Sequence, residues 1–136
     1  MSAPRRVLAV IAAGGAVGST ARYAASLAWP AAEGGFPWAV FVVNVTGCAL
    51  IGVLMVLTVE RGRISHPLVR PFLGVGVLGG FTTFSTYAVG VSELLVRQEV
   101  ATAMVYAGVT AVAALGAVWV AAALTRVLAD GMRRAA

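Results

Sequence analysis

Four long apolar stretches occupy most of this 136-residue chain, and they decide what it can fold into. They span residues 7–29, 38–59, 69–96 and 100–124. A helix needs about 20 predominantly apolar residues to cross the hydrocarbon core of a bilayer, and each stretch is long enough. A soluble domain of this size could not bury so much apolar surface, because small domains leave much of their surface exposed. The sequence therefore predicts an all-α integral membrane protein with four transmembrane helices.

The overall composition supports the same class of protein. Hydrophobic residues make up 60% of the chain and charged residues 11%, whereas soluble domains average about 45–50% and about 25%. The mean hydropathy is +0.94. We therefore expect residues 1–136 to form a single multi-pass domain in the cell membrane.

The arginines indicate how the helices are oriented. All ten basic residues are arginine, and they flank the apolar stretches instead of forming the dense basic stripe of a nucleic-acid-binding protein. Four spans place both termini on one side, and eight arginines lie on that side against Arg97 on the other. The positive-inside rule then predicts cytoplasmic termini. The eight are Arg5, Arg6, Arg61, Arg63, Arg70, Arg126, Arg133 and Arg134.

The third span has a polar, glycine-rich centre that runs from Gly79 to Tyr87. Adjacent glycines favour a departure from helical geometry, and hydroxyl side chains can bond to the backbone, so we expect a break in this helix. Non-helical backbone at bilayer depth must be buried by protein or line a polar site. Carbonyls freed around Gly79 and Thr82 could coordinate a hard cation such as Na⁺. The alternative is a close helix crossing at the glycines.

Two aromatic residues follow this segment at helical spacing. Phe84 and Tyr87 are three residues apart and share a face if the helix resumes. The electropositive edges of two such rings could stabilise a small anion, especially beside polar neighbours such as Ser85. Core packing is the alternative role of this pair.

Further polar residues lie in the other three spans. Asn44 is either a polar link between helices or a donor to a ligand. Tyr106 and Thr110 are four residues apart and offer two hydroxyls along one helix face. Arg22, the one charge in the first span, is expected to anchor that helix more readily than to contact an ion.

Several function classes lack the residues that they need. No span carries Asp or Glu near its centre, which argues against a proton-coupled exporter, including a small multidrug exporter. His66 is the only histidine and falls in a loop, so no catalytic triad can be assembled. We therefore do not expect an enzyme.

Three motifs together resemble the Fluc/CrcB family of fluoride channels. They are Gly-Gly-Ala-Val-Gly-Ser-Thr-Ala-Arg-Tyr at 14–23, Val-Asn-Val-Thr-Gly at 43–47 and Gly-Gly-Phe-Thr-Thr-Phe-Ser-Thr at 79–86. The resemblance covers all four spans, and the third motif is the most specific. It implies an antiparallel, dual-topology dimer that encloses a structural Na⁺ and two narrow fluoride pathways.

The resemblance also implies roles for individual residues. Gly79 and Thr82 would offer carbonyls to Na⁺, Asn44 would donate to fluoride, and Phe84 would present a ring edge to the ion. Tyr87 matches the second phenylalanine of the family, Tyr106 the tyrosine beside the pore, and Arg22 the positive residue near the vestibule. The proposed pathway also includes Ser85 and Thr110.

Some features depart from the family pattern. Tyr87 replaces a phenylalanine, Val40 stands where a hydroxyl residue is frequent, and Gly90 where glutamate is frequent. The strong arginine bias also opposes insertion of one chain in both orientations. Between a homodimer and a heterodimer with an inverted paralogue, we therefore favour the heterodimer. Its function is expected to be passive export of cytoplasmic fluoride; the alternative is a mainly structural subunit that does not line the pore.

Overall fold

The computed structural model describes residues 3–62, 64 and 66–134, and all regular structure in this part of the chain is helical. Arg63, one of the eight arginines used for the orientation, lies outside the described residues. The α-helical elements are α1 (Ala3–Ala28), α2 (Trp38–Met55), α3 (Gly79–Phe81), α4 (Phe84–Val96) and α5 (Val100–Arg134). Two π-helical segments complete the fold: η1 (Val56–Glu60) continues α2, and η2 (Arg70–Leu78) leads into α3.

Four helical stretches are long and apolar enough to cross a membrane, which confirms the predicted all-helical membrane protein. They are Ala3–Ala28, Trp38–Glu60, Arg70–Val96 and Val100–Met132. Large apolar side chains cover the outside of the bundle; Leu115 and Trp119, for example, are 74% and 72% exposed. Such a surface suits lipid or a second membrane subunit, not water.

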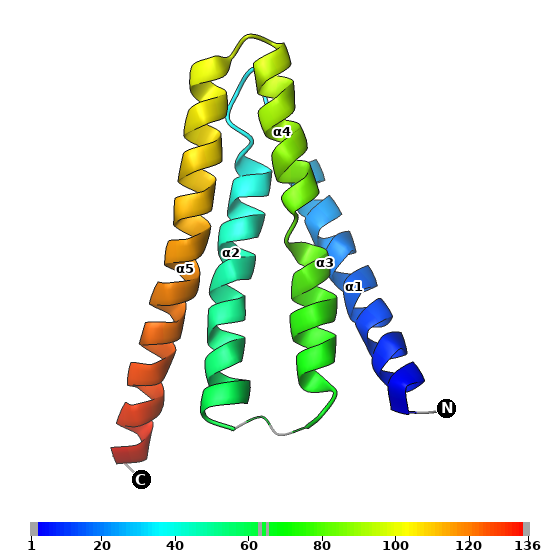
Figure 1. Ribbon diagram of the computed structural model, residues 1–136, viewed down its shortest axis with the longest axis vertical. Coiled ribbons are helices and arrows are strands. Elements are labelled where there is room, and N and C mark those ends of the chain that lie inside the picture. Colours follow the sequence, from blue (N-terminus) through cyan, green and yellow to red (C-terminus); the bar gives the residue numbers. More distant parts are fainter. Residues whose placement is uncertain (1–2, 63, 65, 135–136) are drawn as a thin grey trace.

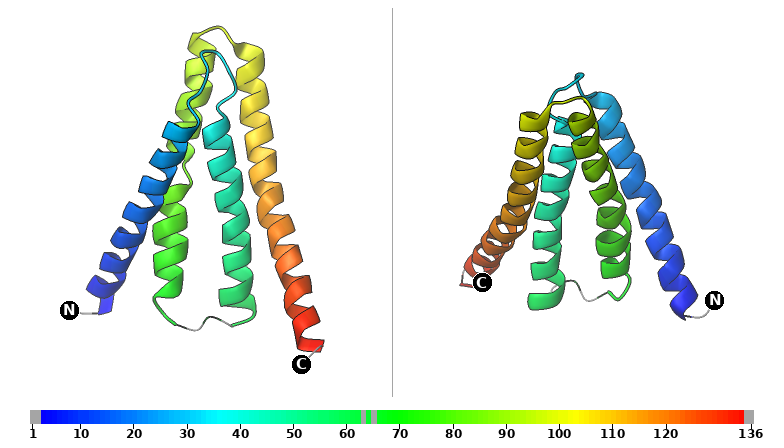
Figure 2. Two further views of the ribbon diagram at one scale, coloured as in Figure 1. Left: turned by 180° about the vertical axis from the view of Figure 1, so that it is seen from behind. Right: turned by 45° about the horizontal axis from the view of Figure 1, so that its top comes forward.

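The bundle is narrow at one end and wide at the other (Figure 1). The α1–α2 connection and the α4–α5 turn lie at the narrow end. Both ends of the chain and the connection between η1 and η2 lie at the wide end, as the view from behind also shows (Figure 2). The even number of spans explains why the two ends share a side.

Glycines bring α1 into close contact with η2 and α3. A Cβ atom added to Gly18 would lie 2.0 Å from the carbonyl oxygen of Val77, and one added to Gly80 would lie 2.5 Å from that of Gly15. Any larger residue at these positions would collide with backbone, so the helices pack as closely as they do because side chains are absent. This pair of helices forms one half of the bundle, and α2 packed on α5 forms the other.

Gly79 and Gly80 do not themselves interrupt the helix, and of the two roles considered for them the close helix crossing holds for Gly80. Both residues lie in helix α3, and Gly79 has φ −65° and ψ −35°. The missing Cβ of Gly80 serves the close approach of α1 and does not end the helix. Helical geometry stops only after Phe81.

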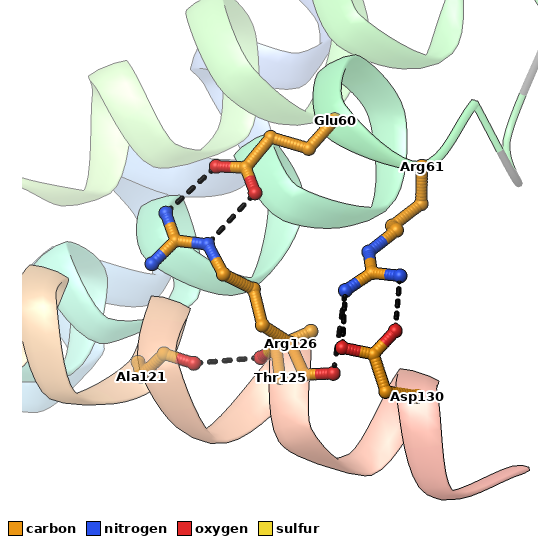
Figure 3. A network of polar contacts seen from close by, with 6 residues as sticks. All are labelled: Glu60, Arg61, Ala121, Thr125, Arg126 and Asp130. Atoms are coloured by element: carbon orange, nitrogen blue, oxygen red, sulfur yellow. Dashed lines mark hydrogen bonds and ion pairs between the residues drawn. The ribbon is translucent and has the colours of Figure 1, made fainter.

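Two ion pairs join Glu60, the last residue of η1, and the following Arg61 to α5 at the wide end (Figure 3). Arg126 donates from Nε and Nη2 to the two carboxylate oxygens of Glu60, at 2.7 Å each. Arg61 pairs with Asp130 through both of its terminal nitrogens, with Nη2 at 2.9 Å from Oδ2. The hydrogen bond to Asp130 raises the pKa of the Arg61 guanidinium, which therefore keeps its charge. Helix α5 reaches these partners because it continues to Arg134, well beyond residue 124, where its apolar stretch was expected to end.

Candidate functional site

The backbone between α3 and α4 is extended at two residues. Thr82 has φ −74° and ψ 153°, and Thr83 has φ −149° and ψ 121°. Thr83 is the N-cap of α4, since its Oγ1 accepts a hydrogen bond of 3.1 Å from the N–H of Thr86. In a continuous helix that N–H would donate to the carbonyl of Thr82. The cap therefore leaves the carbonyl of Thr82 without its usual helical donor.

Asn44 of α2 bonds both backbone polar groups of Thr83. The N–H of Thr83 donates to Oδ1 at 2.8 Å, and Nδ2 donates to the carbonyl of Thr83 at 3.0 Å. Asn44 is only 8% exposed, so these bonds satisfy groups that water does not reach. In a continuous helix the N–H of Thr83 would donate to the carbonyl of Gly79, so this carbonyl has lost its usual donor. Asn44 therefore links two helices, and its Nδ2 carries a second N–H beyond the one used here.

Arg22 connects α1 to both sides of the extended segment. Its Nε donates to the carbonyl of Gly80 at 3.2 Å, and its Nη1 donates to Oγ1 of Thr86 at 3.3 Å. A cation at the last carbonyls of a helix is favourable, because the helix dipole is negative there. The half-buried Arg22 thus anchors α1, and it lines a cavity of about 270 Å³ together with Thr83 and Thr86.

A second cavity, a groove of about 340 Å³, collects side chains from α2, α4, α5 and the extended segment. We call it the threonine groove. Phe84 at its edge is 80% exposed, whereas Asn44 and Thr83 are buried. Polar groups and aromatic carbons therefore line the same space. The groove is lined by Asn44, Cys48, Thr82, Thr83, Phe84, Tyr87, Thr110, Ala111 and Ala114.

Two hydroxyls on α5 are buried without a hydrogen-bond partner among the described residues. They belong to Thr110, 3% exposed, and to Tyr106, fully buried. A buried polar atom left unpaired costs about 1–3 kcal/mol. Thr110 is also one of the residues that line the threonine groove.

The aromatic rings form a row from the extended segment into the core. The ring centroids of Phe84 and Tyr87 are 5.7 Å apart, and those of Tyr87 and Tyr106 are 5.4 Å apart. Tyr106 also packs on Gly90, where an added Cβ atom would lie 3.2 Å from Cε1 of the tyrosine ring. A larger residue at position 90 would therefore require this ring to move.

The structure brings some of the predicted site residues together and separates others. Asn44, Phe84, Tyr87, Thr110 and Thr82 share the threonine groove. The exposed Ser85 touches Oγ1 of Thr83 at 3.3 Å, outside the residues that line the groove. Arg22 lines the other cavity, Tyr106 lies behind Tyr87, and Gly79 is exposed on the surface.

Four residues that line the threonine groove were not among those predicted for the site: Thr83, Cys48, Ala111 and Ala114. Thr83 lines both cavities and caps α4. A hydroxyl residue directly before a helical apolar run is a typical N-cap signal and could have identified it. Cys48 lies one helical turn after Asn44 and so shares its helix face; this spacing is the only sequence signal that could have identified Cys48 as a lining residue.

The described residues contain no group of three or more His, Cys, Asp or Glu side chains that could hold a metal ion. Oxygen ligands for a cation at this site would have to come from backbone carbonyls or hydroxyls. Gly79 and Thr82 supply two carbonyls whose usual helical donors are bound elsewhere.

Comparison with known proteins gives consistent matches over nearly the whole chain. Residues 9–122 match the family model described as CrcB-like protein, Camphor Resistance (CrcB). The chain is 58% identical to fluoride-specific ion channel FluC 1 of Streptomyces coelicolor, over 90% of this chain and 79% of that protein. It is 48% identical to FluC 2 of Nocardia farcinica, over 98% and 100%, and 46% identical to FluC 2 of Thermobifida fusca, over 91% of each.

Proposed function

This chain belongs to the CrcB family, and on that premise we propose that it is a subunit of a fluoride-specific channel that lets fluoride leave the cytoplasm passively. The observation that carries the proposal is the threonine groove. It combines a buried amide, an unpaired buried hydroxyl and an exposed phenylalanine ring at the point where α3 gives way to α4. Among the residues that the structure describes, no acidic side chain lines it.

These groups suit fluoride because the ion is small and strongly hydrated. A narrow path must replace its water by closely placed donors, and larger anions then fit poorly. The second N–H of Asn44, the hydroxyl of Thr110 and the ring edges of Phe84 and Tyr87 are such donors. Tyr106 and Ser85 would extend the pathway beyond the groove, and Arg22 would raise the local anion concentration at its approach.

We further propose that Na⁺ binds at the carbonyls of Gly79 and Thr82. The fit is supported by their chemistry, since both are hard oxygen ligands that have lost their helical donors. Gly79 is exposed at the surface of this subunit, so an inverted second subunit could add two equivalent carbonyls. Bound Na⁺ would contribute positive charge and hold the two subunits together.

The second subunit is proposed to be an inverted paralogue, with both ends of this chain in the cytoplasm. The arginine bias supports one fixed orientation. Relatives numbered FluC 1 and FluC 2 support the existence of several family members that could pair. A well-folded antiparallel homodimer of this chain with rapid fluoride flux would rule this pairing out.

Fluoride-electrode recordings of efflux from liposomes test the channel function. The chain is reconstituted alone and with an oppositely oriented paralogue, in Na⁺ and in Na⁺-free buffer. We expect flux that is selective over chloride, that is lost without Na⁺ and that is lost in Phe84→Ile. Leu128→Ile is the matched control, because Leu128 is 66% exposed and does not line the groove.

The second candidate function is a mainly structural subunit, which completes the Na⁺ site while its partner conducts. The departures at Val40, Tyr87 and Gly90 favour it, because each changes the lining expected of a conducting pathway. If Phe84→Ile leaves the flux of the functional complex intact, this second function replaces the first. If no pairing carries fluoride, both are wrong.

A further inference from the structure

A hydrogen bond ties Tyr87 of α4 to the backbone of α5. The hydroxyl of Tyr87 donates to the carbonyl oxygen of Ala107 at 2.9 Å. That carbonyl also belongs to the ladder of α5, and its oxygen has a second lone pair for this bond. Phenylalanine could not form the link, so the tyrosine adds a fixed point between two helices that the ring alone would not supply.

The position of Ala107 shows where the hydroxyl is directed. Tyr87 lines the threonine groove, and so do Thr110 and Ala111 of α5, but Ala107 is not among the lining residues. The oxygen of Tyr87 is therefore bound to a group outside the groove lining, while the ring that carries it forms part of the wall.

The ring itself is held between two others. It lies 5.7 Å from the ring of the exposed Phe84 and 5.4 Å from that of the fully buried Tyr106. Ala107 directly follows Tyr106 in α5, so the hydrogen bond and the ring contact act at the same turn. Together they fix both the tilt of the Tyr87 ring and the register of α4 on α5.

We infer that Tyr87 is a positioning residue, whose hydroxyl tethers α4 to α5 and so presents the ring edge, and not the hydroxyl, to the groove. This inference rests on the proposed fluoride function. Its consequence is that tyrosine at this position does not disable the pathway of this subunit. A hydroxyl inside the groove would instead add a strong donor and retain the anion.

Two substitutions separate the hydroxyl from the ring. Tyr87→Phe removes the tether and keeps the ring, and we expect its fluoride flux to fall by no more than about fivefold, the factor that one neutral hydrogen bond supplies. Tyr87→Ile removes the aromatic ring and should lower the fluoride flux by more than about tenfold. Thr125→Val is the matched control, since the hydroxyl of Thr125 bonds within α5, to the carbonyl of Ala121 at 2.7 Å.

A second measurement follows the tether without any flux. A ¹³C=¹⁸O label in the carbonyl of Ala107 gives an amide I infrared band whose frequency falls when this carbonyl accepts a second hydrogen bond. We expect the band to move to higher frequency in Tyr87→Phe, which removes that bond, and to stay in place in Thr125→Val.

The inference is overturned if Tyr87→Phe raises the flux, since the hydroxyl then obstructs the pathway, or if Tyr87→Ile conducts as well as Tyr87→Phe. It is equally overturned if the amide I band of Ala107 has the same frequency in Tyr87→Phe as in the unmodified chain. Absence of fluoride flux in every pairing of the unmodified chain would instead refute the proposed function, and the infrared spectra would still decide whether the tether exists.

Discussion

Replacing Asn44 by leucine tests whether the extended segment depends on its link to α2. Leucine has a similar size but cannot bond to the backbone of Thr83, so one N–H and one carbonyl of Thr83 lose their partners. Both lie in a buried part of the bundle, where Asn44 is 8% and Thr83 8% exposed. The substitution should therefore destabilise the fold and not merely alter the groove.

The expected loss follows from these two groups. Each unpaired buried polar group costs about 1–3 kcal/mol, which gives about 2–6 kcal/mol for the pair. The more apolar leucine recovers about 1 kcal/mol through burial. We therefore expect the free energy of unfolding to fall by about 3 kcal/mol, a large share of the total for a domain of this size.

A denaturant titration in lipid bicelles, followed by circular dichroism, measures this loss. Thr46→Val is the matched control on the same helix, because the exposed Thr46 bonds only to its own helix, at the carbonyl of Val42. Hydrogen exchange at the amide of Thr83 should also become faster in Asn44→Leu. If Asn44→Leu unfolds at the same denaturant concentration as Thr46→Val, the extended segment does not need Asn44 and the reasoning fails.

Three further predictions concern other parts of the bundle. Gly18→Ala should lower the free energy of unfolding by about 1–3 kcal/mol through overpacking. Gly108→Ala has open space around its Cβ position and, in the same titration, should leave the free energy of unfolding unchanged or raise it by up to about 1 kcal/mol. Thr110→Val should stabilise the fold by about 1 kcal/mol, because it removes an unpaired hydroxyl, yet lower fluoride efflux from liposomes. Charge reversal at Glu60 alone should destabilise the wide end, and added reversal at Arg126 should restore it; a double-mutant cycle measures this coupling, which high salt should weaken.

Local sequence signals were sufficient for the spans and for residues that share a helix face. Hydropathy is a property of the local sequence alone, and the four apolar stretches predicted from it correspond closely to the four helical stretches. Spacing along one helix likewise placed Phe84 beside Tyr87. Both signals need no knowledge of which helices meet.

The point where α3 ends could not be predicted in the same way, because it depends on side chains from two other helices. Arg22 takes the carbonyl of Gly80, and Asn44 takes both backbone groups of Thr83. Gly80, one of the two glycines that suggested an earlier end, is instead used for contact with α1. The ion pair between Arg61 and Asp130 was missed for the same reason, since 69 positions separate its partners.

The bonds that Arg22 and Asn44 make have a consequence for the order of synthesis. Both residues enter the membrane in the first two spans, and their partners, Gly80 and Thr83, arrive with the third. Until then a guanidinium and a carboxamide have no internal partners in an apolar surrounding, where such groups are costly. The first two helices should therefore remain at the translocon or near the headgroups, and the bundle should close only once the third span has been made.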